Sequence, residues 1–279
     1  MKQKVLPISL VSSDLNGTLV HQHTMSDMIR QYIGEEKFRE ADAVFKKQTS
    51  GMASMEEAFS NAGPLTKGLT LRQAIDYTKT RMEYVTGFFD FVNALGMRSI
   101  PFVINSTGYS VTFYSIREQI GFYRINGFIG NYLKFGWDGD VQATLNEVEL
   151  EKIVRDYFNN SEATRSGIYD SLQATGIIEL GIVDETAKAL LVVEYAQKYF
   201  PEISSAQIAH IGDTMGDSGG ILGIAEKGGI GIAFNYNKPL QDFLEEKVLA
   251  NPDLRERIYY IDAKGPSSDL RHLLPLLSP

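Results

Sequence analysis

The feature that most constrains the fold is an apolar run near the N-terminus that ends in acidic and turn-forming residues. The run, residues 5–11, predicts a buried strand, and Gly17 permits the turn that must follow it. Asp14 is therefore expected just past the carboxyl end of a strand, where open α/β sheets place their ligands. A carboxylate held there can act as a nucleophile or as a metal ligand. Because Asp, Asn and Gly also favour ordinary turns, this stretch alone leaves both interpretations open.

Alternating apolar runs and helical patterns in the rest of the chain predict an α/β fold. The expected architecture is a Rossmann-like core with a parallel sheet flanked by helices. Gly96 is expected as the C-cap of a helix that contains Val85, Phe88, Phe89, Val92 and Leu95. Further strands are expected at 100–104, 177–183, 206–211, 228–234 and 258–261, and further helices at 111–120, 148–158, 239–249 and 270–277.

The segment between the first strand and the second has a different character. Residues 26–82 carry apolar side chains at helical spacing, with breaks at Gly51 and at Gly63-Pro64. This pattern predicts an inserted helical cap domain at 21–82, with the core formed by 1–20 and 83–279. Met52, Met55 and Phe59 are assigned to the interior of this cap, although a cap over a site could also use them.

Residues 123–182 are longer than a simple connection between a strand and a helix requires. Gly127, Gly130, Gly136 and Gly139 predict turns there. A small insertion at 131–176 would account for the extra length.

Three further candidate groups follow predicted strands or open predicted helices. Ser106, Thr107 and Gly108 lie at a strand end before a helix, where a hydroxyl suits a phosphate oxygen but also serves as an ordinary N-cap. Asp213 and Asp217 follow another strand and can point at one Mg²⁺, which prefers oxygen ligands. Lys188 lies in the first turn of a helix capped by Asp184. Because most lysines in such positions are solvated, Lys188 alone is weak evidence of a site.

Composition excludes several classes of function. The net charge of −8 lacks the basic surface that a nucleic-acid backbone or an anionic membrane requires, although a small anionic ligand remains possible. The absence of cysteine removes disulfides, thiolate catalysis and cysteine-ligated metals. The first apolar run is too short for a secretory leader, and no stretch is long enough to span a bilayer, so a cytoplasmic location is expected.

Some motifs point elsewhere but lack the necessary context. His21 and His23 could share a metal on an extended segment, but no third ligand is nearby and a loop or flap is the preferred interpretation. Gly-Asp-Ser-Gly-Gly at 216–220 also occurs around the nucleophile of chymotrypsin-like proteases, but here it lies among alternating strands and helices. The glycines at 228–231 precede a predicted strand, whereas a dinucleotide-binding loop follows one.

Taken together, the motifs resemble those of the haloacid dehalogenase-like (HAD) hydrolase superfamily. The family's Asp-x-Asp-Gly-Thr motif matches residues 14–18, its strand ending in Ser or Thr matches 104–108, its lysine matches Lys188, and its last acidic motif matches Asp213 with Asp217. The helical insertion after the first motif is similar to the cap of the phosphoserine phosphatase-like branch.

The resemblance implies a role for each matching residue. Asp14 would be the nucleophile and form an aspartyl-phosphate. Ser106 and Lys188, with Thr107 and Gly108 beside them, would bind the phosphoryl group of a small phosphorylated metabolite. Mg²⁺ would be held by Asp14, the main-chain carbonyl of Asn16, Asp213 and Asp217, the last directly or through water. Such a site fits phosphoryl transfer, which needs charge neutralisation and alignment.

Asn16 departs from the family pattern. Phosphatases of the family carry there an Asp that protonates the leaving group and then activates water, which an amide cannot do. Because such help is typically worth about 10²–10⁴-fold, the resemblance implies a slow Mg²⁺-dependent phosphohydrolase acting on a small phosphomonoester. The alternatives are a phosphotransferase or another reaction on the same nucleophile, and a non-catalytic protein that binds a phosphorylated ligand.

Overall fold

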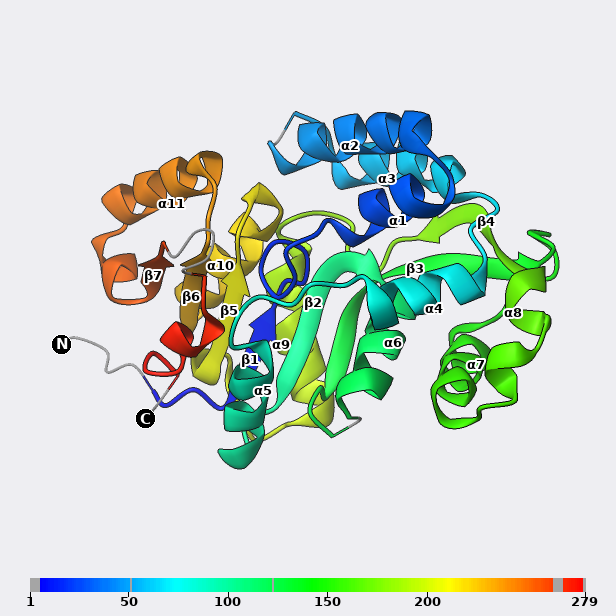
Figure 1. Ribbon diagram of the computed structural model, residues 1–279. Coiled ribbons are helices and arrows are strands. Elements are labelled where there is room, and N and C mark those ends of the chain that lie inside the picture. The colour runs from blue at the N-terminus through cyan, green and yellow to red at the C-terminus, as the bar shows by residue number, and fades with distance from the viewer. Residues whose placement is uncertain (1–5, 51, 122, 263–267, 278–279) are drawn as a thin grey trace.

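The computed structural model describes residues 6–50, 52–121, 123–262 and 268–277. These residues form one seven-stranded sheet with strand order β4-β3-β2-β1-β5-β6-β7 (Figure 1). The strands are β1 (Leu10–Ser13), β2 (Phe102–Tyr109), β3 (Gly127–Trp137), β4 (Leu172–Glu179), β5 (Ile208–Gly212), β6 (Ile230–Phe234) and β7 (Ile258–Ile261).

β1 lies at the centre of the sheet and pairs in parallel with β2 on one side and β5 on the other. The chain therefore builds the sheet outward from β1 in one direction, through β4, and then returns to β5 on the opposite side. Figure 1 shows α5 (Phe88–Met97) in front of the sheet and α9 (Ala187–Tyr199) behind it, as crossovers in opposite directions require. The carboxyl ends of β1 and β5 form the switch point at which such sheets bind ligands.

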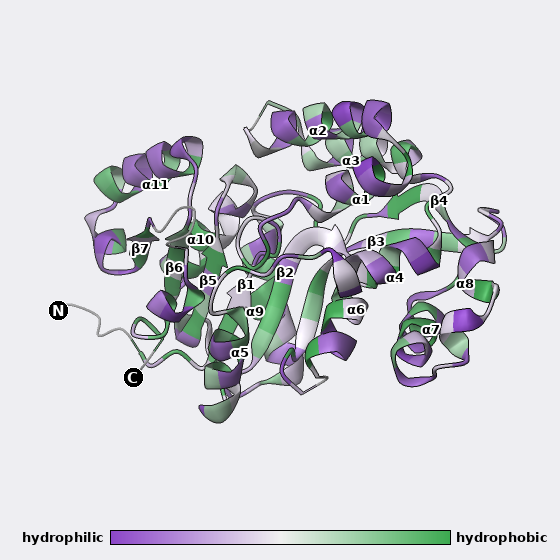
Figure 2. Ribbon diagram, viewed as in Figure 1, coloured by the Kyte–Doolittle hydropathy of each residue, from purple (hydrophilic) through white to green (hydrophobic). Residues whose placement is uncertain are grey.

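The prediction of an α/β fold with helices flanking the sheet is confirmed, but the sheet is not wholly parallel. β4 runs antiparallel to β3 at the edge of the sheet. The inner strands β1, β5 and β6 are buried along their whole length, as expected of strands covered on both faces. Figure 2 shows β5 and β6 in hydrophobic colours, whereas α2 and α11 also carry hydrophilic residues.

The other helices complete the layers around the sheet. None of those in the described ranges combines the length and the apolar character that a membrane span requires. They are α1 (Thr24–Tyr32), α2 (Glu35–Thr49), α3 (Met55–Ala62), α4 (Leu71–Thr80), α6 (Ser110–Ile120), α7 (Glu147–Asn159), α8 (Ile168–Ser171), α10 (Ser218–Glu226) and α11 (Lys238–Ala250).

The first strand begins and ends later than predicted. β1 comprises residues 10–13 rather than 5–11, and Val5 lies outside the described residues. Two buried serines extend the strand because their hydroxyls have partners: Ser12 Oγ lies 3.0 Å from Nδ1 of His210, and Ser13 Oγ donates to the Asp14 carbonyl at 2.8 Å. A hydrogen-bonded hydroxyl costs little to bury, so polar residues can continue a core strand.

The turns predicted at three glycines are wrong. Gly127, Gly130 and Gly136 all lie within β3, and of the four glycines only Gly139 follows the strand. Their lack of a side chain serves close packing instead. A Cβ at Gly127 would lie 2.0 Å from the Tyr195 hydroxyl oxygen, and one at Gly130 would lie 2.5 Å from the Ser106 carbonyl oxygen. Glycine in a strand can mark close approach as well as a turn.

Other boundaries also differ from the predictions. Residues 106–109 belong to β2, and the strand predicted at 177–183 is β4, which ends at Glu179. Gly96 lies inside α5 rather than at its C-cap, and the turn beyond the helix uses Ser99 at a φ of 56°. Of the helix predicted at 270–277, the structure has a short 3₁₀ helix, η7 (Leu270–Leu273), because Pro275 cannot continue helical hydrogen bonding.

The inserted segment is helical, as predicted. It comprises α1 to α4 and the 3₁₀ helix η1 (Gly63–Thr66), and Figure 1 shows α1, α2 and α3 grouped beyond one end of the strands. Thr70 and Gln73 form a capping box that fixes the start of α4, which packs on α6 of the core. Met55 and Phe59 are buried as expected, but Met52 is 75% exposed.

Candidate active site

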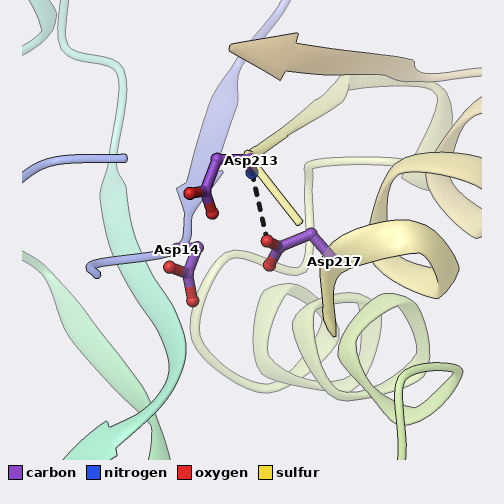
Figure 3. A group of neighbouring side chains, drawn as sticks. All are labelled: Asp14, Asp213 and Asp217. Carbon is purple, nitrogen blue, oxygen red and sulfur yellow. Dashed lines mark hydrogen bonds between the residues drawn. The ribbon is translucent and has the colours of Figure 1, made fainter. Parts of the chain in front are cut away.

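Three aspartates meet at the switch point of the sheet. Asp14 follows β1, Asp213 follows β5, and Asp217 ends the 3₁₀ helix η4 (Met215–Asp217). One carboxylate oxygen from each lies within 4.8 Å of the others, and Figure 3 shows the three side chains around one space. The structure thus brings together residues that are separated by most of the chain.

Lys188 enters this group from the first turn of α9. Its side chain is buried, and Nζ donates hydrogen bonds to Oδ1 of Asp14, at 3.0 Å, and to Oδ1 of Asp217. This lysine is therefore not one of the solvated helix-start lysines that the sequence left as an alternative.

Burial and mutual repulsion perturb the titration of these groups. Burial raises the pKa of Asp14 to about 6, although the Lys188 ammonium opposes this effect. Burial, with the charges of Asp217 and Asp14, raises the pKa of Asp213 well above its ordinary value. Burial alone would lower the pKa of Lys188, but Asp14 and Asp217 outweigh it and raise that pKa. The acids crowd negative charge into a space with one lysine as partner, as expected where a cation binds.

The donor set fits a divalent cation with oxygen ligands. Oδ1 of Asp213 is buried and has no hydrogen-bond partner among the described residues. Asp217 is held in place because its Oδ2 accepts from the main-chain N–H of Asp213, at 3.1 Å, and of Thr214, at 3.3 Å. An unpaired buried carboxylate oxygen is costly, and a bound cation would remove that cost.

Gly17 makes the close approach of the two loops possible. Its φ is +80°, in the left-handed region, and a Cβ at this position would lie 2.1 Å from Oδ2 of Asp213. Glycine is needed here both for the backbone conformation and for the space that the Asp213 carboxylate occupies.

Asn16 joins the loop after β1 to the first inserted helix. Its side-chain Oδ1 accepts a hydrogen bond from the main-chain N–H of Thr24, the first residue of α1, at 3.0 Å. The loop itself is closed by the Gly17 N–H, which donates to the Val20 carbonyl at 2.8 Å. The Asn16 amide therefore serves as a hydrogen-bond acceptor at the site, but it cannot exchange a proton near neutral pH.

The residues predicted at the second strand end lie at different depths. Ser106 is fully buried; its Oγ accepts from the Gly108 N–H at 3.1 Å, and its hydroxyl has a small lowering effect on the pKa of Asp14. Thr107 lines the cavity, whereas Ser106 and Gly108 are absent from the lining residues. The structure thus places Thr107 on the wall and Ser106 behind it.

A cavity of about 190 Å³ lies over the aspartates. Sequence reasoning missed Gln22 and Gln48 in its wall, because their positions depend on how the inserted segment packs on the core. It also missed Thr214 and Gly216, which lie between the two predicted aspartates Asp213 and Asp217. The full lining is Asp14, Asn16, Gly17, His21, Gln22, His23, Gln48, Thr107, Lys188, Asp213, Thr214, Gly216 and Asp217.

His21 and His23 line the cavity. Among the described residues, the group that could hold a metal consists of the three aspartates and includes neither histidine. His23 Nδ1 lies 3.1 Å from the Ser26 hydroxyl oxygen, and its ring lies 4.3 Å from that of Phe45. Burial lowers the pKa of His23 to about 4, so its ring is neutral at pH 7. The loop interpretation of this segment agrees with the structure, in which α1 begins at Thr24.

Comparison with known proteins supports the fold. No family model and no curated protein matches the chain. A solved structure described as a phospho-aspartyl intermediate analogue of phosphoserine phosphatase is 19% identical, has a TM-score of 0.65, and the match covers 98% of this chain and 100% of that one. A substrate-bound phosphoserine phosphatase is 18% identical with a TM-score of 0.67, over 98% and 100% of the two chains. The HAD family hydrolase t0658 from Salmonella enterica serovar Typhi is 18% identical with a TM-score of 0.65, over 99% and 73%. This chain has the fold of these proteins.

Proposed function

We propose that the chain is a member of the HAD superfamily, in its phosphoserine phosphatase-like branch, and hydrolyses a small phosphomonoester through an aspartyl-phosphate on Asp14. The observation that carries this proposal is the buried Asp14 at the switch point, with Lys188 on one of its oxygens and Asp213 and Asp217 beside it. The shared fold with phosphoserine phosphatases supports it.

The reaction has two displacements at phosphorus. First, a carboxylate oxygen of Asp14 attacks the phosphorus, the ester P–O bond breaks, and the departing alkoxide takes a proton from water. Then a water molecule attacks the phosphorus of the aspartyl-phosphate and gives a proton to the hydroxide left by the first step, the bond to Asp14 breaks, and inorganic phosphate leaves. Asp14 returns as the free carboxylate, so the net reaction consumes one water.

The cations of the site offset the charge of the phosphoryl group. Lys188 already holds one oxygen of Asp14 and lies in the cavity wall, so it can contact a phosphoryl oxygen without leaving the nucleophile. The Thr107 hydroxyl on the cavity wall completes the proposed phosphoryl contacts, and Ser106 with the Gly108 N–H supports the strand end behind it. Fixed donors in a buried site stabilise developing charge more than solvent does.

We assign a Mg²⁺ site to the carboxylates of Asp14, Asp213 and Asp217 with the main-chain carbonyl of Asn16. The unpaired Oδ1 of Asp213 is the feature that fits such an ion. When bound, Mg²⁺ would neutralise phosphoryl charge and align the group for in-line attack.

Asn16 makes the proposed enzyme slow with poor leaving groups. No proton-exchanging side chain occupies position 16, so an alkoxide must be protonated by solvent. The expected deficit relative to a complete acid–base pair is about 10²–10⁴-fold.

We further propose that residues 21–82 act as a cap on a core formed by 1–20 and 83–279, with 131–176 as a small insertion in the core. Gln48 supports this division, because it lies on α2 and yet lines the cavity with core residues. A cap of this kind would exclude water from the reacting group.

The test is release of inorganic phosphate from an aryl phosphate, with and without Mg²⁺. We expect Mg²⁺-dependent turnover that falls at least about 10³-fold in Asp14→Asn, because the nucleophile is lost, and stays unchanged in Asp253→Asn, an exposed control. Mass analysis of the quenched wild-type enzyme should find phosphate on Asp14.

The alternatives give different results in the same assay. Phosphate on Asp14 that is released only when an alcohol acceptor is added would identify a phosphotransferase. Binding of phosphorylated ligands with neither turnover nor trapped phosphate would identify a binding protein and contradict the proposal.

A further inference from the structure

The part of the cavity beyond the reacting groups carries no permanent charge. Once Asp14, Lys188, Asp213 and Asp217 are set aside, the described lining residues are Asn16, Gly17, His21, Gln22, His23, Gln48, Thr107, Thr214 and Gly216. None of these is an arginine, a lysine or an acid. Lys188 is already bonded to two carboxylates, so it cannot serve as a free partner for a second anionic group on a substrate.

Several of these polar side chains are already occupied by the protein. Gln22 uses both ends of its amide, because Nε2 donates to the Arg81 carbonyl at 2.9 Å and Oε1 accepts from the Glu83 N–H at 3.1 Å. His23 shares a hydrogen bond with Ser26. These residues shape the wall rather than offer a complete set of free donors and acceptors.

Gln48 is different. Its side chain lies in the last turn of α2 and is only 4% exposed, and a Cβ on Gly216 would lie 3.5 Å from its Nε2. Within the described part of the chain the Gln48 amide has no hydrogen-bond partner, although it faces the cavity. Because the Gln48 side chain is largely enclosed and yet lines the cavity, its amide is available to pair with a ligand there.

We infer that the leaving group of the substrate is a short, uncharged alcohol that carries at least one further hydroxyl, and that Gln48 recognises this hydroxyl. The inference rests on the proposed function. A hydroxyl both donates and accepts, as does the Gln48 amide. A carboxylate on the substrate would lie near three aspartates with no free cation, and an ammonium would have to share the carboxylates already assigned to Lys188 and Mg²⁺. The cavity of about 190 Å³ is below the usual range of ligand sites, which favours a small alcohol.

The experiment compares five phosphate esters of similar length with the wild-type protein in Mg²⁺. They are glycerol phosphate, propyl phosphate, phosphoethanolamine, phosphoglycerate and phosphoserine. We expect kcat/KM for glycerol phosphate to exceed that for each of the others by about tenfold or more, the difference that one or two neutral hydrogen bonds can produce. Thermal stabilisation by the same ligands gives the ranking of binding independently of turnover.

Gln48→Leu tests the assigned contact, because leucine keeps most of the volume and removes the amide. We expect kcat/KM for glycerol phosphate to fall about tenfold, while that for propyl phosphate changes by less than about twofold. An equal loss with both esters would indicate a purely structural role for Gln48 and would overturn the assignment. The variant's melting temperature establishes that it is folded.

The two proposals fail separately. Preferred turnover of phosphoserine, phosphoglycerate or phosphoethanolamine would overturn the inference and leave the proposed phosphatase intact. If no ester is turned over but glycerol phosphate still gives the largest thermal stabilisation, the proposed phosphatase activity is overturned. The recognition of a hydroxylated phosphate ester would then stand. No ranking in either measurement would overturn the inference.

Discussion

An aspartate at position 16 could both anchor the start of α1 and exchange a proton, whereas Asn16 can only anchor the helix. Its Oδ1 holds the N-terminus of α1 through the Thr24 N–H, and an aspartate could make the same hydrogen bond. A carboxylate near a helix N-terminus is also favoured by the helix dipole. Position 16 can therefore gain a group that exchanges protons without losing the contact that orders the loop.

We expect Asn16→Asp to raise turnover of an alkyl phosphate by about 10² or more, because the alkoxide then has an acid beside it. Turnover of an aryl phosphate should change little, since that leaving group departs without much help. Both rates are measured in the wild type and the variant, with Mg²⁺ affinity as a check on the metal site. Equal or lower rates with every alkyl phosphate, in a variant that still binds Mg²⁺, would show that Asn16 is not a missing acid.

At this scale the acidic residues were predictable, because strand ends in a parallel sheet meet at one edge. Lys188 was assigned only through its match to the family's lysine. Gln48 was not predictable. Nothing in its local sequence distinguishes it from an exposed residue of an amphipathic helix, and its place in the cavity depends on the packing of α2 against η4. Thr107 and Ser106 were both candidates, but only the course of β2 decides which of them faces the cavity.

At the scale of elements, the loop after β1 and the loop after β5 approach each other at Gly17. Gly17→Ala should destabilise the protein by about 1–2 kcal/mol from the left-handed φ alone, with a further loss from displacement of the Asp213 carboxylate. Gly68→Ala is a matched control, because Gly68 has a φ of +88° and no atom within 4 Å of its added Cβ.

Unfolding free energies and Mg²⁺ titrations distinguish the two substitutions. We expect both to lower stability, but only Gly17→Ala to weaken Mg²⁺ binding, because only there does the new methyl group meet a proposed ligand. If Mg²⁺ affinity is the same in both variants, the approach of the two loops does not control the metal site.

The order of elements was predictable from hydrophobic periodicity, and their ends were less so. Glycines in β3 gave false turn signals because they accommodate Tyr195 and the Ser106 carbonyl, which lie far away in sequence. The antiparallel direction of the edge strand β4 was not predictable either, since a short apolar run carries no information about the direction of its partner. Long-range packing determines both the glycine positions in β3 and the direction of β4.

For the whole molecule, the buried His210 and the partly buried His23 make stability depend on pH. Burial lowers the pKa of His210 to about 3 and that of His23 to about 4, from an ordinary value of 6.5. Between those values and 6.5 the unfolded chain binds protons that the folded protein does not, so stability falls as the pH decreases through this window. Asp14, with its pKa raised from 3.8 to about 6, acts in the opposite sense: its contribution to stability is lost as the pH rises from about 4 to 6.

His210→Asn isolates the histidine contribution, since the amide can still pair with the Ser12 hydroxyl. In Mg²⁺-free buffer the unfolding free energy of the wild type should fall more steeply between pH 6 and 4 than that of the variant. The difference in slope should approach about 1.4 kcal/mol per pH unit, the value for one proton. Parallel curves would mean that His210 does not titrate on unfolding in this range.

The closed loop at residues 16–20 also affects how the protein ages. An asparagine followed by glycine is prone to deamidation, because the unhindered main-chain nitrogen of Gly17 can attack Cγ of Asn16 and expel ammonia. Water then opens the cyclic imide to aspartate or isoaspartate. In the folded protein the Gly17 N–H is bonded to Val20 and the Asn16 amide to Thr24, so the reaction requires the loop to open.

Stored protein should therefore gain aspartate at position 16 slowly, and its turnover of alkyl phosphates should rise in proportion to the aspartate fraction, measured by peptide mapping that separates aspartate from isoaspartate. Asn16→Gln is the control, because the longer side chain cyclises far more slowly and its activity should not drift. A rise in activity without that mass change would have another origin. In this chain, deamidation of Asn16 during storage would produce the aspartate that the sequence lacks at position 16.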